Sequence, residues 1–183
     1  MLEFTFRSPF YIFIKCAGLY SDEQLLGMFN LRPVNSTYKE LASLRDHDTD
    51  NNIYLTQDEC WVHLMDNFGY TMWNHNGIFD WIGIAALKHD IFWCDVGDTD
   101  RSYSFTYYQN RATRRCFRYD DYYNNKVIER DFGEPLENEG SISCPGKDEL
   151  DRMLMIASSI GIDIDHTHKK IRSYQLSMDK YDF

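Results

Sequence analysis

The chain has 183 residues, 43% of them hydrophobic and 16% aromatic, and this composition excludes an intrinsically disordered protein. It carries 29 acidic and 19 basic side chains, for a formal charge of −10, which disfavours nucleic acid as the main partner because phosphate binding depends on Lys and Arg. No apolar run is long enough to predict a membrane-spanning helix.

Residues 1–90 are predicted to be rich in helix. Two capping boxes, Ser21–Gln24 and Thr56–Glu59, indicate helix starts, because each pairs a hydroxyl with a Gln or Glu side chain that can satisfy the free amides of a first turn. Apolar residues at helical spacing follow both boxes and recur further along the chain. The predicted elements are a strand over residues 10–15, a helix between Ser21 and Pro33, helices over 36–45, 56–68 and 78–88, and an extended stretch over 70–73.

The pattern changes to strands at Ile91. Aromatic and β-branched runs separated by turn residues predict strands over 91–96, 103–109, 113–119 and 126–131, followed by a helix over 147–159 and a closing strand over 172–178. Consecutive strands with short links favour antiparallel pairing. We therefore predict one α+β domain over residues 1–183, in which an antiparallel β-meander at 91–132 packs with several α-helices, and a C-terminal helix and strand lie within 147–178.

The number and spacing of the cysteines indicate the redox state of the cellular compartment. The chain has five Cys and no CxxC pair, which argues against a disulfide framework or a zinc ribbon and favours reduced thiols. The first residues lack the pattern of a secretory signal. We therefore expect a cytoplasmic protein.

An acidic turn with Asp95, Asp98 and Asp100 stands directly before Arg101 and an aromatic strand. The carboxylates could accept hydrogen bonds from backbone amides and pair with Arg101, as in a structural turn. They could instead form part of a partner-binding surface, or hold Mg²⁺ together with water and so support a metal-assisted reaction.

A partner-binding surface would combine this turn with the aromatic strand after it and with a second acidic cluster. Arg and Tyr are frequent among the residues that dominate binding energy at interfaces. The predicted contact residues are Asp95, Asp98, Asp100, Arg101, Tyr103, Tyr107, Asp120 and Asp121.

A basic run, Arg111 to Arg118, lies among aromatic residues, a combination also found on RNA-binding sheets. The net charge of the chain argues against RNA, and strand alternation would place Arg114 and Arg115 on opposite faces. Pairing across the hairpins with acidic residues is the simpler account. These acidic residues are Asp120, Asp121, Glu129 and Asp131.

The segment Asp46–Gln57 resembles the calcium loop of an EF-hand, with Asp46, Asp48 and Asp50 at alternating positions. Two positions depart from that pattern, because Asn51 stands in place of the turn glycine and Gln57 in place of the bidentate Glu. The segment is therefore read either as a degenerate calcium site or as an acidic, solvated loop.

Catalytic motifs are lacking, since no GxSxG, HExxH or P-loop occurs. His166 and His168 could bind a transition metal with Asp163 or Asp165, but no third His or Cys lies nearby in the sequence. A Cys nucleophile stays open because its partners need only be close in space. We predict no catalytic residues and no cofactor other than the possible calcium.

In overall character the chain resembles the bacterial immunity proteins that neutralise toxins, which are small, acidic, cytoplasmic α+β proteins rich in Trp and Tyr. The resemblance implies an inhibitor that blocks a basic protein, such as a cognate toxin, through the segments Asp95–Tyr108 and Asp120–Glu139. The alternatives are a metal-assisted enzyme using Asp95, Asp98 and Asp100, a calcium-binding module using Asp46, Asp48 and Asp50, and a structural or oligomerisation domain.

Overall fold

A computed structural model describes residues 10–34, 38–41, 52–66, 70–73, 75–97, 102–122, 125–139, 149–166 and 169–176. Within these ranges the strands are β1 (Phe10–Ile14), β2 (Lys39–Leu41), β3 (Asn52–Gln57), β4 (Val62–Asp66), β5 (Ile91–Val96), β6 (Tyr103–Gln109), β7 (Ala112–Tyr122), β8 (Asn125–Phe132) and β9 (Ile171–Gln175). The helices are α1 (Asp22–Met28), α2 (Tyr70–Trp73), α3 (Ile78–Ala86) and α4 (Glu149–Ser159).

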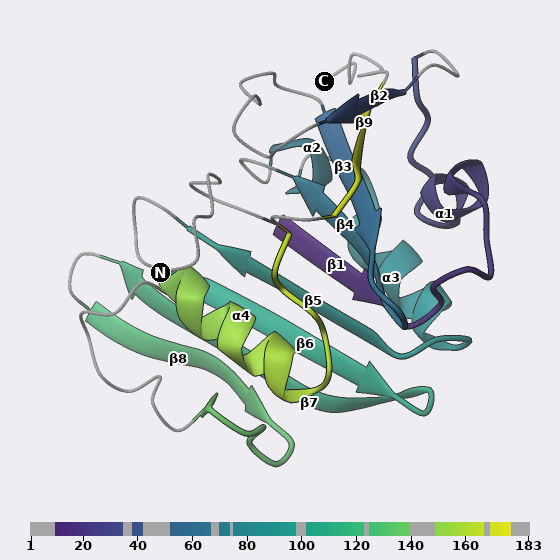
Figure 1. Cartoon of the computed structure of the whole chain (residues 1–183). Helices are drawn as coiled ribbons and strands as arrows, with labels where there is room; N and C mark the ends of the chain where they lie inside the picture. The colour runs from purple at the N-terminus through teal and green to yellow at the C-terminus, as the bar shows by residue number, and fades with distance from the viewer. Residues whose placement is uncertain are drawn as a thin grey trace.

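In the described part of the chain, the nine strands form one antiparallel sheet in the order β2-β9-β3-β4-β1-β5-β6-β7-β8 (Figure 1). The sheet dominates, so the fold is mostly β with some helices. The predicted meander is present as β5 to β8 and forms one half of this larger sheet. Among the described residues, no helix has both the length and the apolar character needed to cross a membrane.

The middle strand, β1, is buried on both faces of the sheet. Its residues alternate between two hydrophobic clusters, with Phe10, Ile12 and Ile14 in one and Tyr11 and Phe13 in the other. The strand pairs with β4 on one side and β5 on the other, so its polar backbone groups are used in the sheet. A strand with no polar side chain in either direction needs a cover on each face.

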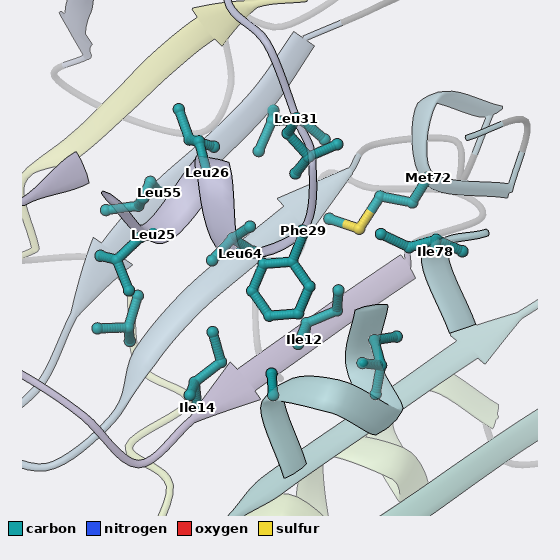
Figure 2. Packing of buried hydrophobic residues seen from close by; sticks show 14 of the residues in the cluster. Ile12, Ile14, Leu25, Leu26, Phe29, Leu31, Leu55, Leu64, Met72 and Ile78 are labelled. Atoms are coloured by element: carbon teal, nitrogen blue, oxygen red, sulfur yellow. The ribbon is translucent and has the colours of Figure 1, made fainter. Parts of the chain in front are cut away.

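Helices α1, α2 and α3 cover one face. Ser21 and Gln24 form the predicted capping box at the start of α1, which confirms that helix. Figure 2 shows the ring of Phe29, just after α1, lying beside Ile12 and Leu64 of the sheet. This face therefore has a dry aliphatic core over β1, β3 and β4.

Helix α4 covers the opposite face and lies over β5 and β6 (Figure 1). Its buried residues Met153, Leu154, Ile156 and Ala157 join a cluster with the aromatic side chains of these strands. Gly161 has φ +87°, a left-handed conformation that suits glycine just after a helix. The predicted helices over 78–88 and 147–159 are thus confirmed as α3 and α4.

The helix predicted over residues 56–68 is wrong, because this stretch is the β3–β4 hairpin. Asp58 accepts hydrogen bonds from the amides of Cys60 and Trp61, at 2.8 and 2.7 Å, and so forms a turn instead of a helix cap. β4 is buried on both faces. Its polar residues His63 and Asp66 are buried as well, so the strand has no solvent-facing polar side, and the spacing of its apolar residues fits a helix as well as a strand.

Two further local predictions are wrong. Residues Lys39–Leu41 form β2, although a helix was expected over 36–45. Residues Tyr70–Trp73 form α2 instead of an extended stretch. The carboxylate of Asp66 accepts from the Met72 amide at 2.8 Å, so a side chain at the end of β4 holds this short helix.

Arg115 is the most highly connected side chain of the meander and is only 2% exposed. Its Nε lies 2.9 and 3.0 Å from the two carboxylate oxygens of Glu139, and its Nη1 lies 2.5 Å from Asp131 Oδ1. The same Nη1 donates to the carbonyls of Phe132 and Gly133 at 3.0 Å each. Arg115 thereby ties β7 to β8 and to the segment that follows it.

We expect Arg115→Met to lower the free energy of unfolding by roughly 3–5 kcal/mol, because buried Glu139 then loses its counter-charge. Urea denaturation measures the change. Arg114→Met is the matched control, since Arg114 is the exposed neighbour on the same strand and its replacement should change stability by less than about 0.5 kcal/mol. Equal effects of the two substitutions would contradict the role given to Arg115.

Candidate functional site

The face that carries α1, α2 and α3 is hollowed beyond β5. The register places Trp93, Thr106 and Cys116 side by side on β5, β6 and β7, and Ser104 next to Arg118 in the neighbouring row. These side chains line a pocket of about 420 Å³ that also reaches α2, α3 and β8. Small-molecule pockets commonly have volumes of about 300–1,000 Å³. The pocket is therefore large enough for a side chain or a small ligand.

An aromatic wall, made of Trp73, Phe79 and Trp93, bounds the pocket on the helical side. Trp73 and Phe79 have ring centroids 5.3 Å apart, and Phe79 and Trp93 have theirs 5.2 Å apart. All three rings contact the buried ring of Phe10, at 5.7 to 6.0 Å. This contact fixes the wall to β1, while Trp73 and Phe79 remain 43% and 40% exposed.

The floor of the pocket is polar. Ser104 and Thr106 are buried, and the Thr106 hydroxyl lies 3.4 Å from Cys116 Sγ. Tyr108 stands at the margin, where burial raises the pKa of its hydroxyl, while a hydrogen bond from Trp93 and the charge of Arg130 lower it. The net shift is upward, so the phenol stays protonated near neutral pH.

Two arginines form the side of the pocket away from the helices. Arg118 Nε lies 2.8 Å from Glu129 Oε2, and its Nη2 lies 3.9 Å from Asp120 Oδ2. Arg130 is exposed and makes no ion pair or hydrogen bond with any residue that the structure describes. Among the described residues, the site therefore presents one guanidinium without an ion pair, in the same pocket as the aromatic wall.

The residues predicted from the acidic turn lie in several environments. Asp95 is buried and accepts a hydrogen bond from the Ser104 hydroxyl, as expected of a structural carboxylate. Tyr103 and Tyr107 are buried in the cluster beneath α4, so they offer little area to a partner. Asp120 lies near Arg118.

Several predicted residues lie outside the described residues, so their roles stay predictions. They are Asp98, Asp100 and Arg101 of the acidic turn, the side chain of Asp121, and Asp46, Asp48 and Asp50 of the calcium-like loop.

The predicted pairing of the basic run is confirmed for two arginines. Arg115 pairs with Asp131 and Arg118 with Glu129 across the β7–β8 hairpin. The alternation prediction also agrees with the burial, since Arg115 is buried and Arg114 is exposed. Two of the four arginines of the run are thus paired within the sheet, and the run does not form a continuous basic stripe.

A buried chain of three side chains lies outside the pocket and was not predicted. His63 Nε2 lies 2.9 Å from Asp58 Oδ2, and His63 Nδ1 lies 2.9 Å from His166 Nε2. Burial lowers the pKa of both imidazoles, to about 3 for His166. The two histidines are far apart in the sequence, and no local pattern indicates that they meet. They join the β3–β4 turn to the segment after α4.

The metal-binding alternative considered for His166 and His168 is not tested by the structure. His168 lies outside the described residues, and His166 contacts His63. The described part of the chain holds no group of three or more His, Cys, Asp or Glu side chains placed to bind a metal ion.

Comparisons with known proteins give no match, whether with protein-family models, with curated proteins or with solved structures. The pocket is therefore interpreted from its own geometry and chemistry.

We expect acidification from pH 7 to pH 5 to destabilise the fold through His63 and His166. The folded state holds the His166 imidazole neutral over this range, while the unfolded chain takes up protons from about pH 6.5 downward, so stability falls as the pH drops towards the folded pKa of about 3 for His166. The lowered pKa of His63 acts in the same direction. This residue alone should contribute about 2 kcal/mol of loss over that range.

Urea denaturation at both pH values measures this effect, with His166→Gln as the comparison. The amide cannot take up a proton, so the variant should lose about 2 kcal/mol less than the wild type on acidification, even if it is less stable at pH 7. An equal loss in both proteins would contradict this assignment. The lowered pKa of Asp58 changes the free energy of unfolding only below about pH 4, so it does not affect the comparison between pH 7 and pH 5.

Proposed function

We propose that this protein binds another protein and inhibits it, as the resemblance to immunity proteins implies, and that the pocket face is its contact surface. The observation that carries the proposal is the aromatic wall, in which Trp73 and Phe79 are each about two-fifths exposed at the edge of a pocket. Monomeric proteins seldom expose large clustered aromatic side chains without a binding role.

The composition of the pocket supports a protein partner. Trp, Tyr and Arg are the residues that most often dominate interface energetics, and Trp73, Trp93, Tyr108 and Arg130 meet here. Because the rings pack on Phe10 of the middle strand, they are held in place before binding and lose little side-chain freedom when a partner arrives.

The net charge indicates what kind of partner would approach. A charge of −10 attracts a basic protein over long range and speeds its encounter. Exposed carboxylates such as Glu23, Asp80, Glu134 and Glu137 would contribute to this attraction. The partner we propose is therefore a basic protein, such as a toxin, met in the cytoplasm. For the fold we propose an α+β class, because the helices fall into separate groups on the two faces.

The proposal predicts that the double substitution Trp73→Ala and Phe79→Ser weakens partner binding by at least roughly thirtyfold, as expected for hot-spot residues that contribute about 2 kcal/mol or more. The measurement is quantitative affinity purification from the cells that produce the protein. Thermal unfolding verifies that the variant is folded.

The matched control is Ile84→Ser, which removes a 50% exposed apolar side chain of α3 that does not line the pocket. It should retain the partner. If no protein is enriched by the wild type, or if the double variant retains the same partner as the control, the proposal is wrong.

A further inference from the structure

We infer that the pocket recognises the C-terminal residue of the partner protein when that residue is aromatic, with its ring on the aromatic wall and its α-carboxylate on Arg130. This inference deepens the proposed function and rests on the pocket being the contact site. It specifies the chemical group that enters the pocket.

The need for a ring follows from the wall. Trp73 and Phe79 meet at 67° and Phe79 and Trp93 at 58°, so neighbouring rings present faces and edges in different directions. Aromatic pairs favour offset-stacked and edge-to-face contacts at centroid distances of about 4.5–7 Å. A flat ring entering the pocket can therefore make favourable contacts that an aliphatic chain of the same size cannot.

The need for an anion follows from Arg130. Its guanidinium has no ion pair with any described residue. Its positive charge works to lower the pKa of the Tyr108 hydroxyl, and this hydroxyl accepts a hydrogen bond from Trp93. Tyr108 thus interacts both with Trp93 of the aromatic wall and with the charge of Arg130. A guanidinium binds a carboxylate with two parallel hydrogen bonds, which is stronger and more directional than a neutral contact.

The charge balance favours a single negative charge. Arg118 pairs with Glu129 at 2.8 Å and lies 3.9 Å from Asp120, while Arg130 has no ion pair with any described residue. A carboxylate matches this charge. A phosphate dianion would bring a second negative charge towards Glu129 and Asp120, where like charges repel. This argues against a nucleotide, although a nucleotide also has a flat ring.

The size and the floor agree with this group. About 420 Å³ is enough for an indole or phenyl ring with a short acidic arm. The hydroxyls of Ser104 and Thr106 and the phenol of Tyr108 provide polar contacts for an indole N–H or a carboxylate oxygen.

The test uses the full chain and two peptides, acetyl-Gly-Trp with a free carboxylate and the same peptide as its amide, in titrations followed by NMR. The acid should bind with a dissociation constant at least tenfold lower than that of the amide. In Arg130→Gln the acid and the amide should bind equally, and Arg114→Gln, an exposed arginine outside the pocket, should keep the preference. Acetyl-Gly-Ala, which has no ring, should not bind.

Several outcomes would overturn the inference. Two of them concern the peptides: equal binding of acid and amide to the wild type, and a preference for the acid that survives in Arg130→Gln. The other two concern other ligands: tighter binding of adenosine monophosphate than of the acid peptide, and binding of free indole-3-propionate without binding of the peptide. If the peptides behave as expected but affinity purification finds no protein partner, the proposed function fails and the chemistry of the pocket stands. If a partner binds through the wall but the peptides show no preference, only the present inference fails.

Discussion

The arrangement of this protein depends on the middle strand β1, which has an apolar side chain in both directions. Because Phe10, Ile12 and Ile14 face one way and Tyr11 and Phe13 the other, the sheet must be covered on both sides at its centre. Three helices do this on one face and α4 on the other. Helices α1, α2 and α3 extend only as far as β5, and the pocket forms at the edge of the area that they cover. The aromatic wall is the outermost part of that cover, anchored on Phe10.

Much of the fold could be predicted where the spacing of apolar residues clearly distinguishes a helix from a strand. The β5 to β8 meander has turn residues at short intervals, α3 and α4 have helical spacing, and the capping box at Ser21 identifies α1. The β3–β4 hairpin could not be separated from a helix, because Leu55, Val62 and Leu64 face one cluster and Tyr54, Trp61 and Met65 the other. The short helix α2 depends on the Asp66 carboxylate, a tertiary contact that no local pattern indicates.

The candidate site was harder to predict because its residues come from six elements. Trp93 and Arg130 are far apart in the chain and are brought together by the strand register, while Trp73 reaches the site by packing on Phe10. The acidic and aromatic residues near the β5–β6 turn did indicate a candidate contact surface in this half of the sheet. They could not show that Tyr103 and Tyr107 face α4, while Ser104, Thr106 and Tyr108 face the pocket. Two of the predicted contact residues, Tyr103 and Tyr107, thus lie on the face that α4 covers.

The position of β9 has a consequence for how the chain folds as it is synthesised. This strand lies between β2 and β3, so a segment near residue 175 pairs with segments near residues 40 and 54. Until it has been made, β3 has an open edge and β2 has no neighbour in the sheet. Contacts between such distant parts of a chain form slowly, and an open strand edge is prone to pair with other chains. The ribosome must therefore release nearly the whole described chain before that edge can close, and in this interval β3 is the strand most exposed to wrong pairing.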